Sequence, residues 1–105
     1  MNYYKTSLLS SPLEPLTYSS LLEIDTGSIV RVLLNKRELR GIIISESEKP
    51  DFDTIEIGEV SDLYYSSKQL ELAKFISTYY MCSLGDAFSL MLPFSHSDTL
   101  LENSD

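Results

Sequence analysis

The first 62 residues alternate between short apolar runs and turn-forming residues, a pattern typical of β-strands. Five such runs predict strands over residues 3–9, 16–24, 28–34, 39–45 and 54–60. The turn signals between them are Ser10-Ser11-Pro12, Asp25-Thr26-Gly27, Asn35-Lys36-Arg37-Glu38 and an acidic loop over 46–53. Runs 28–34 and 39–45 therefore predict an antiparallel hairpin, and Gly58 predicts a bulge in the last strand.

After residue 64 the hydrophobic period changes to that of a helix. Ser66 and Gln69 have the spacing of a capping box and predict a helix over residues 67–81. Its apolar stripe consists of Leu70, Leu72, Ala73, Phe75, Ile76, Tyr79 and Tyr80. Ser83 predicts the start of a second, short helix that ends near Leu92, before Pro93. We expect Leu84, Ala87, Phe88 and Met91 to form the buried face of this second helix. We also expect the aromatic side chains of both helices to pack in the core.

This order of elements predicts an α+β domain. We expect a small antiparallel β-barrel, similar to OB folds or to formyltransferase C-terminal domains, with one main C-terminal helix and a short second helix. The polar stretch that begins at Phe94 reads as a tail. The predicted division is a domain over residues 1–94 and a linker or disordered tail over 95–105.

Composition agrees with one globular domain in a reducing compartment. Of the 105 residues, 43% are hydrophobic, and one is a cysteine, which excludes an internal disulfide. No apolar run approaches the ~18 residues of a membrane span, and the N-terminal sequence lacks the features of a signal peptide. We therefore expect a cytoplasmic protein that does not associate with membranes.

The net charge of −8 argues against nucleic acid as a partner, but the charge is unevenly distributed. Residues 46–105 carry twelve acidic and three basic residues, whereas residues 1–45 carry four acidic and five basic residues. Four of the eight basic residues are Arg31, Lys36, Arg37 and Arg40. An anionic partner would bind at this cluster, although from charge alone a solvated hairpin with ordinary surface charges is the simpler explanation.

The sequence offers no catalytic arrangement. It contains no phosphate-binding glycine loop, no dinucleotide fingerprint and no CxxC pair. The single histidine, His96, lies in the predicted tail, and Cys82 reads as an inert, half-buried thiol. The paired carboxylates Glu46/Glu48 and Asp51/Asp53 indicate a solvated loop, with weak divalent-ion binding as a minor option. We predict that this stretch is not an enzyme and needs no cofactor.

Two segments together resemble a known family. Residues 27–42 (GSIVRVLLNKRELRGI) are similar to the pattern G-x-R-V-x-V-P-F-G-x-R-x-x-x-G-[IV]. Residues 72–88 (LAKFISTYYMCSLGDAF), followed by Leu92-Pro93, are similar to L-A-x-W-[IM]-A-x-Y-Y-x-x-P-[IL]-G-[ED]-V-[LF]…L-P. Both patterns belong to the N-terminal domain of the PriA family of bacterial replication-restart DNA helicases. The resemblance covers about residues 5–94.

The resemblance implies a DNA-binding domain that begins a much longer helicase. In that family the domain binds the 3′ end of the nascent leading strand at stalled forks, for primosome assembly. ATP, Mg and Zn belong to other parts of such a protein, so the resemblance implies a fragment. Its implied partners are DNA, the rest of its own helicase chain and primosome proteins.

Carried over to this sequence, the 3′-end pocket comprises Leu16, Thr17, Tyr18, Asn35 and Ile55, with Lys36, Arg37 and Arg40 as phosphate contacts. The family has Phe-Asp-Tyr where this chain has Leu16, Thr17 and Tyr18, so the tyrosine alone is kept. Asn35 replaces a turn glycine, and Ile55 replaces a lysine. An alternative interpretation is an interaction module that has lost its nucleotide pocket. It would dock onto the helicase core or a primosome partner through Tyr64-Tyr65 and Tyr79-Tyr80.

Overall fold

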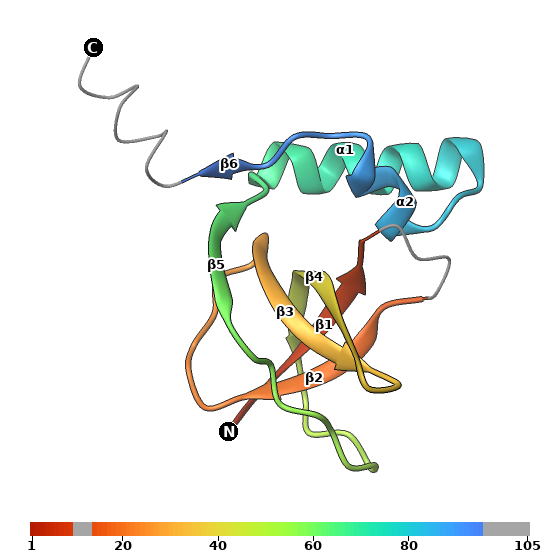
Figure 1. The fold of residues 1–105 in the computed structure, drawn as a ribbon. Helices are drawn as coiled ribbons and strands as arrows, with labels where there is room; N and C mark the ends of the chain where they lie inside the picture. Colours follow the sequence, from red (N-terminus) through yellow and green to blue (C-terminus); the bar gives the residue numbers. More distant parts are fainter. Residues whose placement is uncertain (10–13, 96–105) are drawn as a thin grey trace.

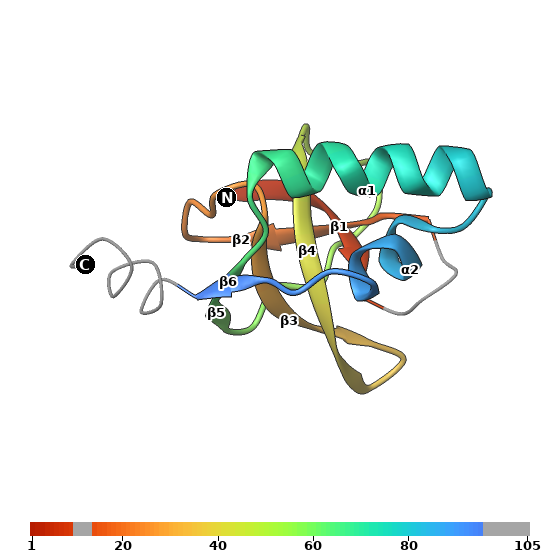
Figure 2. The same ribbon diagram turned by 90° about the horizontal axis from the view of Figure 1, so that it is seen from above.

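A computed structural model describes residues 1–9 and 14–95 of the chain, which form a small barrel with two helices on one side (Figures 1 and 2). In chain order the elements are β1 (Asn2–Leu8), β2 (Leu16–Ser20), β3 (Ser28–Leu34), β4 (Arg37–Ser47), β5 (Val60–Tyr64), α1 (Ser67–Tyr80), α2 (Leu84–Ser89) and β6 (Phe94–Ser95). The strands form one antiparallel sheet in the order β2-β1-β4-β3-β5-β6. The predicted α+β barrel-like class is confirmed.

The chain before β5 closes the sheet into a barrel. Ser19 of β2 donates its backbone N–H to the Ile55 carbonyl (3.1 Å) and accepts from the Ile57 N–H (2.7 Å). The next two residues of this segment pair with β3, where Arg31 exchanges backbone hydrogen bonds with Gly58 and Glu59, both 2.8 Å. The strand predicted over 54–60 is therefore wrong as a regular strand. Its first residues bond to β2 and its next residues bond to β3, so it does not form a continuous ladder with either strand. The regular strand β5 begins only at Val60.

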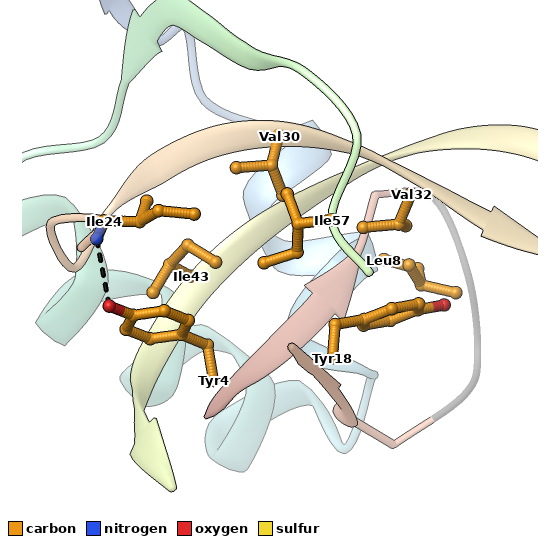
Figure 3. Packing of buried hydrophobic residues seen from close by; sticks show 8 residues of the cluster. All are labelled: Tyr4, Leu8, Tyr18, Ile24, Val30, Val32, Ile43 and Ile57. Atoms are coloured by element: carbon orange, nitrogen blue, oxygen red, sulfur yellow. Dashed lines mark hydrogen bonds between the residues drawn. The ribbon is translucent and has the colours of Figure 1, made fainter. Parts of the chain in front are cut away.

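The barrel interior is filled by apolar side chains from β1 to β4 and from the segments after β2 and before β5 (Figure 3). These are Tyr4, Leu8, Tyr18, Ile24, Val30, Val32, Ile43 and Ile57. Tyr4 is 1% exposed, and its hydroxyl accepts a 2.9 Å hydrogen bond from the Ile24 backbone N–H, drawn as the dashed line in Figure 3. This bond satisfies a buried donor in the segment between β2 and β3, where no strand partner is available.

The helices cover a second core on the outer side of β3 and β4. Ser66 and Gln69 form the predicted capping box, with Ser66 Oγ accepting from the Gln69 N–H and Gln69 Oε1 accepting from the Ser66 N–H. The second core contains Ile29, Ile42, Tyr65, Ala73, Ala87 and Phe88. Within the described residues, neither helix has the length and apolar content to cross a membrane.

The apolar stripe of α1 is narrower than predicted. Ala73 is buried, and Leu70 and Ile76 pack against the second core. Phe75, Tyr79 and Tyr80 instead lie in solvent, 62%, 68% and 69% exposed, so the prediction that they pack in the core is wrong. Only one side of α1 meets the sheet and α2, and these three residues project from the other sides of the helix.

The hairpin turn is tighter than predicted. Asn35 and Lys36 alone form it, both with left-handed φ angles (51° and 66°), and β4 begins at Arg37 rather than at residue 39. Two left-handed residues are the geometry of a two-residue turn that matches strand twist. The four-residue turn over 35–38 is therefore wrong.

The remaining ends differ in smaller ways. The second strand stops at Ser20, and α2 stops at Ser89 rather than near Leu92. Phe94 and Ser95, predicted to start a tail, pair with Tyr64 and Leu63 as β6. The break predicted at Ser10-Ser11-Pro12 and the rest of the tail, with His96, lie outside the described residues.

We expect Tyr4→Phe to destabilise the domain by about 1–3 kcal/mol, because it leaves the buried Ile24 N–H without an acceptor. Urea unfolding followed by circular dichroism measures the loss. Tyr3→Phe is the matched control, because the half-buried Tyr3 hydroxyl makes no hydrogen bond within the described residues. Equal stability of the two variants would contradict the role of this bond.

Candidate nucleic-acid interface

The end of the β3–β4 hairpin carries the predicted cations, and it lies away from α1 in both ribbon views (Figures 1 and 2). Lys36 lies in the turn, and Arg37 follows as the first residue of β4. Arg40 lies three residues further along the strand. All three side chains are exposed, and none makes an ion pair within residues 1–9 and 14–95. Lys36, Arg37 and Arg40 are thus available to an anionic partner.

Strand alternation divides these cations between two faces of the hairpin. Arg37 pairs with Leu34, on the face whose side chains pack against the barrel core. Arg40 pairs with Arg31, on the outer face. Neighbouring residues of a strand point to opposite faces, so residues 37 and 40, three apart, do too. The structure therefore does not bring all the predicted phosphate contacts to one surface.

Tyr18 lies inside the barrel wall. The residue is 3% exposed, and its hydroxyl donates a 3.2 Å hydrogen bond to the Leu33 carbonyl at the end of β3 (Figure 3 shows the ring). Burial raises the pKa of the Tyr18 hydroxyl above its usual value. This part-buried hydrogen bond ties Tyr18 to Leu33, which lies two residues before Asn35 in the turn.

The other predicted pocket residues surround the place where the barrel closes. Leu16 is half-buried against the core on the same face of β2 as Tyr18, and Thr17 alternates to the opposite face. Ile55 is 49% exposed, and its carbonyl accepts from the Ser19 N–H beside Tyr18. The structure thus brings Tyr18 next to Ile55 along the backbone, and next to the Asn35 turn through Leu33.

A hollow of about 390 Å³ adjoins these residues, and the sequence did not identify its lining. It lies between the end of β3 and the closing segment, and is lined by Arg31, Val32, Leu33, Glu38, Glu56, Gly58 and Glu59. Three glutamates and one arginine therefore line this hollow. The hollow forms because β3 pairs with β5 only as far as Val30, which leaves the far end of β3 open on that side. No local sequence signal marks such an open end.

A larger hollow, about 670 Å³, lies elsewhere, between Pro15 and the helix ends. Its one cation, Lys74, is accompanied by Glu14 and Asp86, so its charge does not favour a phosphate. The described residues contain no group of three or more His, Cys, Asp or Glu side chains that could hold a metal ion, which includes the acidic loop 46–53. Of the two hollows, only the one beside Leu33 adjoins the predicted site.

The two tyrosine pairs predicted to contact another protein differ in exposure. Tyr65 is buried, and its hydroxyl donates to the Phe88 and Met91 carbonyls (3.0 and 3.1 Å). Burial raises the pKa of Tyr65, and the nearby Arg40 guanidinium partly offsets the rise. Tyr79 and Tyr80 are exposed and in contact, with ring centroids 4.9 Å apart. Tyr65 is thus structural, and only the second pair is accessible.

A closed small barrel with a cationic hairpin beside its closing segment is an architecture that suits binding of a nucleic-acid strand. Comparison with known proteins is consistent with that class. The sequence model of the family described as 3′ DNA-binding domain (3′BD) matches residues 8–93. The chain belongs to this family of DNA-binding domains, which confirms the resemblance noted from the two segments.

Relatives of this chain carry the name replication restart protein PriA. The protein of that name from Helicobacter pylori (strain ATCC 700392 / 26695) is 34% identical over 98 residues, 93% of this chain. The one from Rickettsia conorii is 37% identical over 98 residues, 89% of this chain, and the one from Rickettsia prowazekii is 36% identical over 103 residues, 93% of this chain. The matched part is 15% to 16% of the length of these relatives.

We expect stability to fall above pH 10, and Tyr18→Phe to reduce that fall. The folded protein holds the Tyr18 proton more tightly than the unfolded chain does. The contribution of protonated Tyr18 to the stability of the fold is therefore complete below about pH 10, the pKa of tyrosine in the unfolded chain. It is lost as the pH rises through the higher pKa of Tyr18 in the folded protein. Urea unfolding at pH 8 and pH 10.5 measures the difference, with the exposed Tyr79→Phe as control. The same loss in all three proteins would contradict the assignment.

Proposed function

We propose that this chain recognises the 3′ end of a DNA strand, as the DNA-binding part of a replication-restart helicase. The observation that carries the proposal is the family match over residues 8–93, which includes both the hairpin and the closing segment. In this role the domain finds the 3′ end of the nascent leading strand at a stalled fork. The longer protein then begins primosome assembly there.

The proposed site is the region that Tyr18 joins to the Asn35 turn through Leu33 and to Ile55 through the neighbouring Ser19. A terminal nucleotide has a free 3′-OH and no following phosphate, so a closed end of a groove selects it by steric exclusion. The exposed Ile55 side chain and the half-buried Leu16 offer apolar contact that does not depend on base identity. Lys36 and Arg37, adjacent to Asn35 at the end of the hairpin, provide phosphate contacts.

Charge predicts a weak and salt-sensitive interaction. At low salt the net charge of −8 repels DNA at long range, and three glutamates line the hollow beside the site. Only a few cations are within reach of the strand, so affinity depends on a small number of phosphate contacts. Such a domain acts together with other DNA-binding surfaces of a longer protein, because linking two weak contacts raises their combined affinity.

We assign no catalysis and no cofactor to the domain itself. The chain spans 15% to 16% of its relatives' length, and on this proposal ATP-dependent unwinding and metal binding belong to other parts of such a helicase. Its partners on this proposal are DNA, the rest of the helicase chain and primosome proteins.

A second function is favoured by the exposed aromatic rings of α1. Phe75 and Tyr79 are stacked in solvent, with centroids 5.7 Å apart, and Tyr80 packs against Tyr79. Aromatic side chains are enriched at protein interfaces. An interaction module that docks on the helicase core or a primosome protein would use this surface rather than the hairpin.

We expect the domain to prefer a single-stranded oligonucleotide with a free 3′-OH over one with a 3′-phosphate. The added phosphate enlarges the terminus and brings charge beside the carboxylates of the hollow. Fluorescence anisotropy at low salt, with the dye at the 5′ end, measures both affinities. Ile55→Glu places a carboxylate in the proposed site, and we expect it to weaken end binding by about tenfold.

Two other outcomes are informative. Equal binding of both oligonucleotides would contradict end recognition and leave an unspecific electrostatic contact. No binding of either would favour the interaction module. Tyr79→Ser, remote from the hairpin, is the control for both measurements.

A further inference from the structure

Arg31 and Arg40 face each other across the β3–β4 hairpin. They are directly paired residues of the antiparallel ladder, so their side chains leave the same, outer face with Cβ atoms about 5 Å apart. On the other side of Arg31 lies Glu59, whose backbone carbonyl accepts from the Arg31 N–H. The three residues form an outer row in the order Glu59, Arg31, Arg40.

The charges of the outer row are incompletely compensated. Arg31 Nη1 lies 3.4 Å from Glu59 Oε2, and both side chains are largely in solvent, 59% and 78% exposed. Such surface ion pairs are weak and exchange readily with other partners. Arg40 makes no ion pair within the part of the chain that the structure describes. Two like charges directly opposite each other on a sheet are unfavourable, so an anion between them is stabilising.

The surroundings of the row leave this anion position accessible. Glu38 lies on the same face, two residues before Arg40, and is the nearest opposing charge on β4, while Glu56 lines the hollow beside Arg31. Tyr65, close enough to Arg40 for its charge to matter, is neutral, and its hydroxyl donates to the helix-end carbonyls. Arg37 lies on the other face, so it does not contribute to the same position.

We propose that Arg31 and Arg40 together hold one internal phosphodiester of the bound DNA strand, and that Glu59 competes with this phosphate for Arg31. Two guanidinium groups from adjacent strands supply several N–H donors to the phosphate oxygens. The inference rests on the proposed function, since it takes DNA as the ligand. It differs from end recognition, because this pair contacts the backbone whether or not a terminus is present.

The experiment compares a linear 30-nucleotide strand with a covalently closed circle of the same sequence. Anisotropy of internally labelled strands is measured between 20 and 200 mM salt for wild type, Arg31→Gln, Arg40→Gln and Glu59→Gln. Lys68→Gln is the matched control, because Lys68 is an exposed lysine on α1 whose loss changes net charge equally. Urea unfolding confirms that each variant is folded.

We expect R31Q and R40Q each to weaken binding about fivefold. For each variant the factor should be the same for the linear strand and for the circular strand. Each should lower the salt slope of the affinity by about 0.7, the value for one contact to a single strand. E59Q should tighten binding about twofold, and it should lose this effect when combined with R31Q. K68Q should leave binding within about twofold of wild type.

Each contrary result has a separate meaning. If wild type binds and R31Q and R40Q do not differ from K68Q, the phosphate pair is wrong and the proposed DNA-binding function stands. If the two variants weaken the line but not the circle, the residues act at the terminus and the inference is also overturned. If wild type binds neither strand, DNA binding itself fails, and the inference fails with it.

Discussion

Four backbone hydrogen bonds from residues 55–59 connect β2 to β3, and the position of the candidate interface depends on them. Ser19 is bonded at one end of this short segment and Arg31 at the other. Because β2 is the edge of the sheet, these bonds close the barrel and enclose Tyr18 beneath Ile57. The same closure brings Ile55 beside Tyr18 and leaves the far end of β3 open, where the hollow forms.

The parts of the fold that follow local rules were predictable from the sequence. The capping box at Ser66 and the helical period fixed α1, and β-branched residues flanking a turn fixed the hairpin. The closing segment was not predictable, because its residues pair with two strands and keep no single alternation. The exact turn was missed for a related reason: Arg37 and Glu38 suit a turn as well as a strand. Only the cross-strand pairing of Arg37 with Leu34 decides between them.

The candidate site shows the same division. The sequence identifies Lys36, Arg37 and Arg40 as a cluster, but the face on which each lies depends on register, which a one-residue slip would reverse. The acidic lining of the hollow was not predictable either. Glu38 and Glu59 are 21 positions apart and meet only because the barrel closes. The exposed aromatic rings of α1 were wrongly predicted to be buried. The apolar stripe of a helix predicts which side faces the core, but not how many of its residues are covered by other elements.

The acidity of the domain is compatible with the proposed binding when distance is considered. Charges separated by more than about 8 Å are largely screened at physiological salt, so a phosphate at the hairpin is influenced mainly by its immediate neighbours. Near Arg31 and Arg40 these neighbours are Glu38, Glu56 and Glu59, so the local net charge is not positive. Attraction there is then decided by geometry, since two guanidinium groups can approach one phosphate closely while the carboxylates remain in solvent. A domain of this kind gains little binding affinity from long stretches of internal DNA. Its choice of binding position on DNA then depends on contacts that recognise the shape of the strand and its end.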